Sequence, residues 1–515
     1  MTGAADSTYD VIVVGGGGAG LAAAIEARRL GRDVLLVEKN EALGGSTSWS
    51  IGSVSATATP HQIAKGIKDG PDGHFDDMPG FAGPLHAREN NELRRILCDE
   101  MPETFRWLLD HGLRFYGPMP EPPHRQPRMH NVLPNSKAYV YHLGRAARRA
   151  GVRIETGARV AQLIKEDGGI VGVECAGGPG VRRYRARGGV ILAAGDFTNS
   201  PELKRRYMGE REAKVSAVNL TATGDGQTLG MAVGGRVLNG DLALGPEIRF
   251  IPPKSQPLVG RMPPWTWLAE FMAWSLDHMP DAILRPFVMS FLTTALAPSP
   301  TLFQQGAILI NRDGRRFADE MDAPAFAIPD QPESTAYILI DGRIGRSFSA
   351  WPNFISTAPG IAYAYLADYR RNRPDVYQQA ATLGELADRI GAGRAALEQT
   401  VTACNAERAK RAGAERGTNA PPLPELSEPP YVLLGPVRSV FVHAEGGLAV
   451  DNLHRVLDEA DRPVPGLYAA GSTGQGGLLL KGHGHHLAWA FVSGRRAGRH
   501  AALATASAPT VAMAS

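Results

Sequence analysis

The start of the chain shows two kinds of hydrophobic pattern in succession. Residues 11–14 are consecutive β-branched apolar residues, which is typical of a strand buried on both faces of a parallel sheet. Residues 21–30 are rich in alanine and leucine and predict a helix. Residues 33–37 contain a second apolar run and predict another strand. The pattern therefore predicts a strand–helix–strand unit of the kind found in α/β folds.

The rest of the chain continues as a mixture of helices and strands. Apolar residues at helical spacing predict helices over 91–113, 140–150 and 387–408, and a further helix after 223. Short apolar runs predict strands at 151–160, 189–195, 337–340 and 466–471. Residues 306–320 read as a hairpin whose turn contains Asp313 and Gly314.

Two stretches have no such period and are expected to be irregular. Residues 61–90 are polar and rich in Gly, Pro and Asp, and residues 118–134 are dense in proline. The second stretch contains Arg125, Arg128 and His130. Two interpretations stay open for these three residues: a solvated loop, or contact with an anion or carboxylate at the mouth of a site.

Glycines connect the first predicted strand to the helix. Gly15, Gly17 and Gly20 have G-x-G-x-x-G spacing, and the same loop includes Gly18 and Ala19. Gly15 permits the tight turn, Gly17 lets a pyrophosphate approach the backbone, and Gly20 lets the helix pack closely on the strand. The helix N-terminus then presents unpaired N–H groups to the pyrophosphate.

Glu38 stands at the end of the second predicted strand. A carboxylate at this position accepts hydrogen bonds from the hydroxyls of an adenosine ribose and repels an additional phosphate. The strand, the glycines, the helix and the acid together predict a site for FAD or NAD rather than NADP.

The loop over residues 39–55 is small and rich in hydroxyl groups, as suits contact with phosphates or with the rim of a flat ring. Its pattern, E-K-x(4)-G-G-S-T-x(2)-S-x-G, resembles the flavoprotein family of fumarate reductases, succinate dehydrogenases and 3-ketosteroid Δ1-dehydrogenases. The resemblance implies that the loop runs along FAD to the isoalloxazine through Lys39, Gly45, Ser46, Thr47, Ser50 and Gly52. Relatives with covalent FAD carry a histidine here, and this chain has none between Gly44 and Val54, so non-covalent FAD is expected.

The resemblance covers nearly the whole chain, because residues 306–320 also match the family's G-A-I-L-V-N-x-x-G-x-R-F-x-N-E signature. It implies further FAD contacts at Val160, Ala194, Gly195, Asp225, Gly471, Ser472, His486 and Leu487. For Asp225, a helix N-cap is an equally open interpretation.

Together these patterns predict an α/β fold: a Rossmann-like FAD-binding domain in two parts, with an inserted α+β cap domain for the substrate. The expected divisions are 1–240 for the first part, 241–444 for the cap, 445–505 for the second part and 506–515 for a disordered tail.

Composition and charge narrow the class of protein. The 515 residues carry a formal net charge of +3 without a basic block, which argues against nucleic-acid binding. The three cysteines, Cys98, Cys175 and Cys404, have no C-x-x-C spacing, so no disulfide framework or zinc site is expected. The start of the chain has no signal-peptide pattern and no apolar run is long enough to span a bilayer, so a cytoplasmic location is expected.

Residues 262–300 are unusually aromatic: they hold three tryptophans and three phenylalanines but only four Asp, Glu, Lys or Arg residues. Pro280 and Pro286 are expected to break the segment into short helices. Three interpretations stay open: the core of a cap over an apolar substrate, a dimer contact, or a peripheral membrane contact that admits a lipid-like substrate.

The family resemblance also implies where the chemistry lies. Fumarate reductases use a histidine, an arginine and a second arginine that donates the proton, and these positions correspond to His443, Lys481 and Pro324. A proline cannot transfer a proton, so fumarate reduction is not expected. The tyrosines of the ketosteroid dehydrogenases are absent as well, because Ala323-Pro324 and the stretch 480–482 replace them.

A group of basic residues before the last predicted helix is the distinctive candidate for catalysis: Lys481, His483, His485 and His486. Lys481 and His443 are candidates for holding a carbonyl oxygen or a carboxylate, and His483 or His485 for the general acid or base. Alternatively, Lys481 contacts the flavin pyrimidine and the histidines cap the helix. Metal binding by H-x-H-H is not expected, because no carboxylate or cysteine accompanies it and adjacent histidines point apart on a helix.

The sequence thus predicts an FAD-dependent dehydrogenase that acts on a CH–CH bond beside the carbonyl of a cyclic or steroid-like ketone, with an unidentified electron acceptor. An enoate reductase that reduces the double bond of an unsaturated acid is the main competing hypothesis. A flavin subunit that only passes electrons to a partner is a further hypothesis, which the large cap argues against. A flavin monooxygenase is disfavoured by the G-G-S-T loop and by the match over residues 306–320, which both resemble the dehydrogenase and reductase family.

Overall fold

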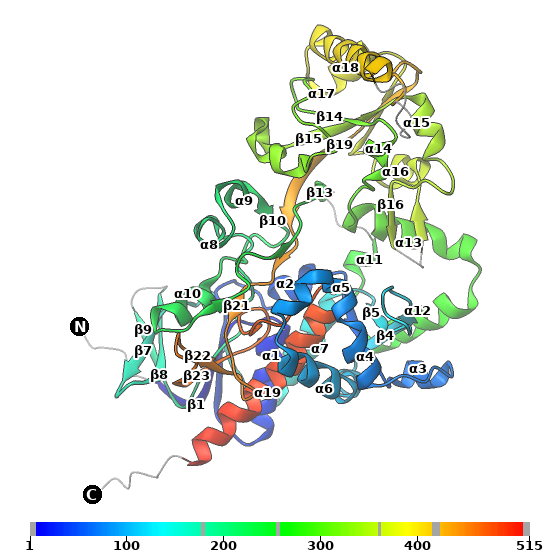
Figure 1. Ribbon diagram of the computed structural model, residues 1–515. Helices are drawn as coiled ribbons and strands as arrows, with labels where there is room; N and C mark the ends of the chain where they lie inside the picture. The colour runs from blue at the N-terminus through cyan, green and yellow to red at the C-terminus, as the bar shows by residue number, and fades with distance from the viewer. Residues whose placement is uncertain (1–6, 177–180, 254–257, 359–361, 415–422, 508–515) are drawn as a thin grey trace, which may run out of the picture.

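A computed structural model describes residues 7–176, 181–253, 258–358, 362–414 and 423–507. The described chain is a mixed α/β fold with two main sheets, so the predicted fold class is confirmed. Figure 1 shows the two sheets in a lower and an upper part of the molecule, with the long strand β19 (Tyr431–Phe441) running between them.

The lower sheet contains the predicted strand–helix–strand unit at its centre. β1 (Ser7–Val14) is parallel to β2 (Val34–Val37) on one side and to β9 (Arg182–Leu192) on the other. The strand order is β22-β23-β9-β1-β2-β6, and β7 and β8 extend from β9. The added strands are β6 (Arg153–Glu155), β7 (Arg159–Glu166), β8 (Gly169–Ala176), β22 (Arg455–Leu457) and β23 (Pro463–Ala469).

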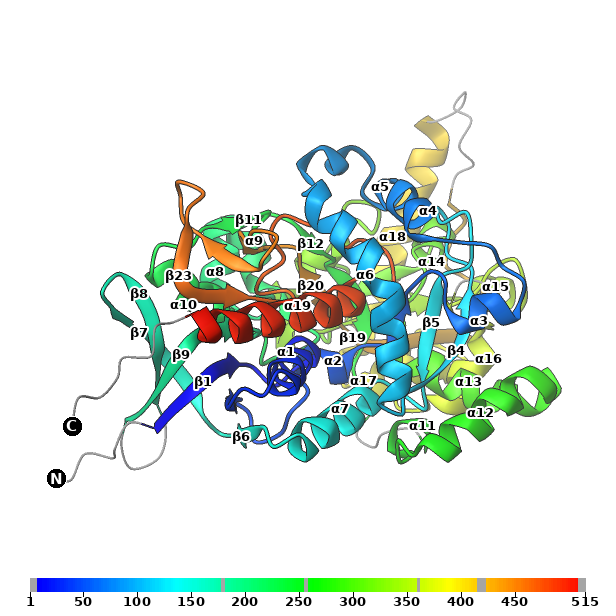
Figure 2. The ribbon, with the colours of Figure 1, turned by 90° about the horizontal axis from the view of Figure 1, so that it is seen from below.

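Two helices far apart in sequence lie side by side against this sheet. They are α1 (Gly18–Arg29) and α19 (His485–Ser507), and Figure 2 shows them together with α6 (Asn91–Asp110) and α7 (Lys137–Arg149). Their approach depends on glycine, because a Cβ at Gly494 would lie 2.3 Å from the carbonyl oxygen of Ala19. This packing brings the middle of α19, around Phe491 and Gly494, to the loop that follows β1.

The upper sheet has the order β10-β19-β15-β14, and β13 and β18 also pair with β19. Its strands are β10 (Ser216–Ala217), β13 (Glu247–Phe250), β14 (Ile308–Ile310), β15 (Ala336–Ile340) and β18 (Tyr377–Ala380). Its buried side chains form a hydrophobic cluster separate from that of the lower sheet. β10 precedes residue 240 yet belongs to the upper sheet, and the expected domain divisions stay a prediction.

The remaining elements connect these parts. The short strands are β3 (Ser53–Ser55), β4 (Arg114–Met119), β5 (Met129–Leu133), β11 (Val237–Leu238), β12 (Ala243–Leu244), β16 (Ser356–Ala358), β17 (Ala362–Ala364), β20 (His443–Ala444) and β21 (Gly447–Leu448). The other helices are α2 (Gly45–Trp49), α8 (Pro201–Tyr207), α9 (Glu210–Lys214), α10 (Asp225–Ala232), α11 (Leu258–Arg261), α14 (Thr301–Gln304), η2 (Pro324–Asp330), η3 (Pro332–Ser334), α15 (Gly342–Ser347) and α16 (Leu366–Asn372).

The prediction that residues 61–90 are irregular is wrong. The segment forms α3 (Pro60–Ala64), α4 (Pro71–Asp77), α5 (Pro79–Ala82) and η1 (Gly83–Arg88). Each helix carries a proline in its first turn, where the missing N–H costs nothing and the fixed φ favours the helix. Prolines that indicate loops in the sequence therefore start helices in the fold.

Residues 118–134 are also partly regular, because β5 pairs with both β3 and β4. The segment does not present its basic residues as a solvated loop. Arg128 is 1% exposed and bonds to Asp69 (2.8 Å) and Asp77 (2.5 Å), while Arg125 pairs with Asp77 from the surface. His130 is buried and lies 3.0 Å from the hydroxyl of Thr59. Arg128 and His130 stabilise the fold.

Three boundary predictions fail for local reasons. Residues 306–320 contain one short strand, β14, and the returning chain makes a single bridge at Arg316 instead of a second strand. Pro286 lies within α13 (Asp281–Ala295) and does not end it. The predicted helix over 387–408 is two helices, α17 (Leu383–Ile390) and α18 (Arg394–Ala414), because Gly391 adopts a φ of +74° and ends the first one.

The aromatic segment gives a mixed outcome. Met289 is buried, as a cap core requires, but α12 (Thr266–His278) presents its aromatic side chains to solvent. Trp267 is 61% exposed, and Trp265, Phe271 and Trp274 are also exposed. None of the described helices is long and apolar enough to cross a bilayer. Of the expected disordered tail, residues 508–515 lie outside the described residues, and residues 506–507 belong to α19.

Candidate active site

A deep cavity opens at the carboxyl ends of the parallel strands of the lower sheet, where α/β folds bind their ligands. Most of the predicted cofactor-binding residues lie in its wall: Gly15, Gly17, Gly18, Ala19, Glu38, Lys39, Gly45, Ser46, Thr47, Ser50, Gly52, Val160, Ala194, Gly195, Asp225, Gly471, Ser472, His486 and Leu487. Gly20 is the exception and lies behind the wall. The fold therefore brings chain segments from both ends and from the middle of the sequence around one cavity.

The glycine loop after β1 has the geometry that a close-fitting ligand needs. Gly15 has a φ of +108°, and a Cβ on Gly20 would lie 1.9 Å from the carbonyl oxygen of Gly15, so both positions require glycine for packing. Gly17 is different, because a Cβ there would meet nothing closer than 3.7 Å. Packing therefore leaves the backbone at Gly17 open toward the cavity.

Glu38 anchors the same loop at the end of β2. Its carboxylate accepts hydrogen bonds from the backbone N–H of Gly16 (2.7 Å) and from the backbone and side chain of Asn40 (2.9 and 2.7 Å). A carboxylate has about four acceptor sites, so capacity for a ligand hydroxyl remains.

Asp225 pairs with two cations in the cavity wall. Its carboxylate is 2.9 Å from the Nζ of Lys39 and 3.0 Å from a guanidinium nitrogen of Arg159. Burial opposes ionisation of this carboxyl, but the bonds from Lys39 and Arg159 outweigh it and hold the pKa of Asp225 below its usual value. The N-cap interpretation of Asp225 is wrong, because Gly224 is the N-cap of α10 and Asp225 is its first helical residue.

A buried carboxylate, Glu445, organises the far end of the cavity. It is 1% exposed and accepts hydrogen bonds from the side chain of Gln475 and from the backbone N–H of Leu480 (3.1 Å). The Nε2 of His443 lies 3.4 Å from its Oε1, and the ring of His486 lies 3.4 Å from the ring of His443, centroid to centroid. The pattern H-A-E-G-G contains Glu445, but sequence reasoning did not single it out.

These neighbours also set the protonation of the group. Burial opposes the charge on Glu445, yet the imidazoles of His443 and His486 beside it hold its pKa well below the usual value. Burial, and then the neighbouring His443, lower the pKa of His486 to about 4, so this imidazole is neutral near pH 7. Within the described residues, neither ring nitrogen of His486 has a hydrogen-bond partner.

Comparison with known proteins indicates which cofactor this chain binds. A family model described as an FAD binding domain matches residues 10–257 and 284–479. The chain belongs to this family.

Three similar proteins place the chain within it. The probable fumarate reductase of Shewanella frigidimarina is 26% identical over 510 residues, which cover 96% of this chain and 75% of the relative. The 4-oxocyclohex-2-ene-1-carboxylate 5-dehydrogenase of Sinomonas cyclohexanicum is 25% identical over 605 residues, which cover 96% of this chain and 93% of the relative. A solved flavocytochrome c3 fumarate reductase in its open conformation shares the fold, with a TM-score of 0.71 at 23% identity over 98% of this chain and 79% of that one.

The protein is therefore an FAD-dependent oxidoreductase. The residues present fit this cofactor: the open backbone at Gly17 and the N-terminus of α1 suit the pyrophosphate, and Glu38 suits an unphosphorylated ribose. The N-terminus of α19 stands at the other end of the cavity, with His486 and Leu487 in the wall. A helix N-terminus there favours the negative charge that a reduced flavin carries.

The predicted catalytic residues are not all brought to the FAD cavity. His443 and His483 lie in its wall, whereas Lys481, His485 and the proline at the family's acid position, Pro324, do not. The catalytic role of Lys481 stays a prediction.

His483 has a partner that sequence reasoning missed. Its Nδ1 and its backbone N–H both lie close to Oε1 of Glu121, at 2.5 and 2.8 Å. The hydrogen bond to Glu121 raises the pKa of His483 above its ordinary value. Glu121 comes from the proline-dense segment, so only the fold could place it beside His483.

His485 points away from the cavity and into the protein. It is fully buried, its Nδ1 donates to the carbonyl oxygen of Lys481 (2.6 Å), and its Nε2 faces His74 and His124. Burial lowers the pKa of all three imidazoles, that of His124 to about 2, so they are neutral near pH 7.

Proposed function

We propose that this FAD-dependent oxidoreductase dehydrogenates the carbon–carbon bond beside the carbonyl group of a cyclic, apolar ketone. The observation that carries the choice of a ketone over an unsaturated acid is the pairing of charge in the cavity wall. Among the described wall residues, the Lys and Arg side chains are Lys39, Arg159 and Arg249, and each has a carboxylate partner.

Lys39 and Arg159 share Asp225, and Arg249 lies 2.8 Å from the carboxylate of Glu247. A cation whose charge is already compensated gains little from a second carboxylate, since the substrate would compete with a partner fixed by the protein. A dicarboxylate such as fumarate therefore finds no uncompensated Lys or Arg in this described wall, and the proton-donor position of the fumarate reductases holds Pro324.

The part of the wall beyond the flavin residues suits an uncharged ring. Leu244, Leu296 and Val442 line it, and His443, His483 and His486 supply the hydrogen-bonding groups nearby. This combination of apolar surface with a few polar groups is typical of sites that bind small hydrophobic molecules and orient one polar atom.

When bound, FAD supplies the acceptor for the hydride that leaves the carbon β to the carbonyl. The chain's residues do the rest. His443 and His486, fixed by Glu445, hydrogen-bond the carbonyl oxygen, where negative charge develops as the α-proton leaves. His483, positioned by Glu121, takes that proton, and the electron pair of the broken C–H bond forms the new double bond. Loss of one proton and one hydride balances the two-electron reduction of the cofactor.

One relative supports a cyclic ketone as the substrate class, because its name describes the dehydrogenation of an oxocyclohexene ring, although that ring also carries a carboxylate. The fumarate reductase relative supports the reverse reaction on an unsaturated acid. The ion pairs that compensate Lys39, Arg159 and Arg249 in the cavity wall favour the cyclic ketone as the substrate class.

The proposal is tested by turnover in both directions. The purified enzyme is incubated with cyclic and steroid ketones and an artificial electron-accepting dye, and separately with a reduced dye and unsaturated acids. We expect dye reduction with at least one saturated ketone and no dye oxidation by fumarate. Turnover with acids and none with ketones would overturn the proposal in favour of an enoate reductase.

Single substitutions then test the assigned roles. His483→Gln should lower kcat by about 10²- to 10⁴-fold, as expected for loss of a proton-transfer group, and leave bound FAD unchanged. His278→Gln, at an exposed position on α12, is the matched control and should turn over like the wild type. Lys481→Met tests the remaining candidate, and unchanged turnover would remove Lys481 from the catalytic set.

A further inference from the structure

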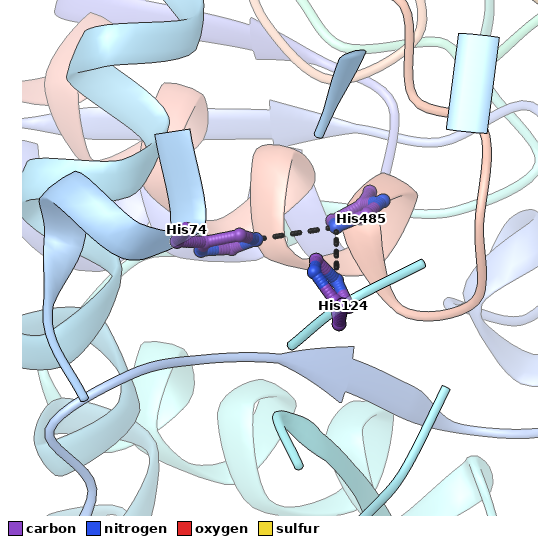
Figure 3. Close-up of side chains that lie close together, drawn as sticks. All are labelled: His74, His124 and His485. Carbon is purple, nitrogen blue, oxygen red and sulfur yellow. Dashed lines mark hydrogen bonds between the residues drawn. The ribbon is translucent and has the colours of Figure 1, made fainter. Parts of the chain in front are cut away.

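Three buried histidines from distant parts of the chain meet beside the FAD cavity. His74 lies on α4, His124 in the segment between β4 and β5, and His485 at the first position of α19. They are 0%, 7% and 0% exposed. Figure 3 shows the ring of His485 facing the other two, with one nitrogen of each ring directed toward a common region.

The nitrogen positions match a tetrahedral metal site. The Nε2 of His485 lies 3.2 Å from the Nε2 of His74 and 3.3 Å from the Nε2 of His124. Zinc binds imidazole nitrogen at about 2.0–2.1 Å, and the tetrahedral angle then places two ligand nitrogens about 3.3–3.4 Å apart. The ligand atoms of the three histidines all lie within 4.8 Å of one another, so one ion can contact all three after small adjustments.

Hydrogen bonds alone do not satisfy this cluster. The Nδ1 of His485 carries a hydrogen, because it faces the carbonyl oxygen of Lys481. The Nε2 of the same neutral ring therefore has a lone pair and can only accept a hydrogen bond. Arg128 donates to the Nδ1 of His124 (2.8 Å), so the Nε2–H of His124 uses that lone pair. His74 has no hydrogen-bond partner left in this cluster. Its Nε2 faces the Nε2 of His485, whose lone pair already accepts from His124, and its Nδ1 is buried without a partner in the described residues.

We propose that His74, His124 and His485 bind one divalent ion of the zinc class. The ion takes the lone pairs of His74 and His485 directly. His485 has the outer contact that such ligands use, because its Nδ1–H donates to a backbone carbonyl. His124 becomes the third ligand in its other tautomer, which carries the hydrogen on Nδ1 and leaves Nε2 free to bind the ion. The guanidinium of Arg128 then gives up its hydrogen bond to the Nδ1 of His124 and keeps its bonds to Asp69 and Asp77.

The surroundings assign the ion a structural role. Phe81 packs edge-on against His124 and His485, with centroids 4.7 and 5.3 Å apart, and none of the three histidines lies in the wall of the FAD cavity. The ion would tie α4, the segment that carries Glu121, and the start of α19 together. It therefore holds the Glu121–His483 pair in place without touching the substrate.

The metal content of the purified protein tests the proposal. The wild type is expressed in zinc-supplemented medium, purified without a histidine tag and dialysed against a metal-free buffer, and its metal is measured by inductively coupled plasma mass spectrometry. We expect about one equivalent per chain, because a buried ion held by three histidines should stay bound during dialysis. Less than about one tenth of an equivalent in the wild type would overturn the proposal.

Variants locate the ion. His74→Ala and His124→Ala should each lose it, whereas the exposed-site control His278→Ala should keep it. His443, Glu445 and His486 form a second group with metal-ligating atoms in the cavity, so His443→Ala is the decisive comparison. Loss of metal from His443→Ala and not from His74→Ala would contradict the assignment.

A wild-type measurement covers the case in which the alanine variants do not fold. Diffraction from wild-type crystals on either side of the zinc absorption edge should show one anomalous peak within about 2.2 Å of the three Nε2 atoms. A metal-containing protein with no peak at this position would overturn the proposal as well.

Discussion

Two glycines of the same motif should respond to alanine in opposite ways. A Cβ on Gly17 would be 3.7 Å from its nearest neighbour, the carbonyl oxygen of Gly44, which is ordinary contact. A Cβ on Gly20 would be 1.9 Å from the carbonyl oxygen of Gly15, and no side-chain rotation relieves this clash, because the backbone fixes the positions of both atoms. Gly17→Ala therefore tests the ligand, and Gly20→Ala tests the fold.

The magnitudes follow from these contacts. At the N-cap, Gly17→Ala loses about 0.5–1 kcal/mol of capping preference and regains about 0.4–1 kcal/mol from the restricted unfolded chain, so the apoprotein should keep nearly all of its stability. The added methyl blocks the approach of the pyrophosphate and removes at least one charge-assisted hydrogen bond of about 1.5–3 kcal/mol. FAD affinity should thus fall about 10- to 150-fold. Gly20→Ala must displace α1 and costs about 1–3 kcal/mol of folding free energy or more.

The assay separates the two effects. Thermal unfolding of the FAD-free proteins reports stability, and quenching of FAD fluorescence on titration reports affinity. We expect Gly17→Ala to melt within about 2 °C of the wild type and Gly20→Ala to melt several degrees lower. Wild-type FAD affinity in Gly17→Ala would refute the inference that the cofactor approaches this backbone, and a wild-type melting temperature in Gly20→Ala would refute the packing argument.

Other predictions follow from single contacts. Glu445→Gln keeps the shape of the side chain but removes the charge that fixes His443, so kcat should fall about 10²- to 10³-fold while FAD content, read from the visible spectrum, is unchanged; undiminished turnover would contradict the role of Glu445. The depressed pKa of Asp225 means that its contribution to stability is complete above the unfolded pKa of about 3.9 and is lost as the pH falls through its lower native pKa. Unfolding of Asp225→Asn should therefore depend less on pH below about 5 than unfolding of the wild type does, and parallel profiles would argue against it. Sedimentation with phospholipid vesicles tests the exposed aromatic face of α12: Trp267→Ser combined with Trp274→Ser should reduce binding if this face contacts a membrane, and a wild-type protein that stays in the supernatant would exclude that interpretation.

The FAD half of the site is predictable from the sequence because its residues follow from local rules. The glycine motif, the acid at the end of β2 and the hydroxyl-rich loop each occupy a fixed place in a strand–helix–strand unit. Nearly all of the predicted FAD contacts accordingly line one cavity. Gly20 lies outside it, since its role is to let α1 approach β1.

The catalytic half is not predictable in the same way, because its contacts join segments without a sequence signal. Glu121 reaches His483 from 362 residues away, and Glu445 acts through partners that only the folded chain supplies. In the sequence, His485 stands between the candidate residues His483 and His486 and is therefore expected to be catalytic. In the fold, the first turn of α19 directs its side chain into the protein interior. The expectation of no metal site depends on the H-x-H-H stretch alone, whereas the proposed ligands His74 and His124 come from elsewhere.

Proline accounts for the clearest error in the secondary structure. Pro71 and Pro79 indicate loops by composition, yet each begins a helix, as Pro60 does just before them. Of these three helices, only the one at Pro60 has a side-chain cap: Thr59, just before the proline, accepts a hydrogen bond from the backbone N–H of Gln62, whereas Gly70 and Met78 make no such bond. Such capping patterns are short and easily missed in a polar segment.

The most direct test of the central claim is an anaerobic spectral titration of the oxidised enzyme. Saturated cyclic and steroid ketones are added in turn, without any other electron acceptor, and the visible absorption of the bound flavin is followed. If the enzyme dehydrogenates ketones, one of them should bleach the flavin band, with the α,β-unsaturated ketone as product. If no ketone bleaches the band and an unsaturated acid reoxidises the chemically reduced enzyme instead, the proposed function is wrong.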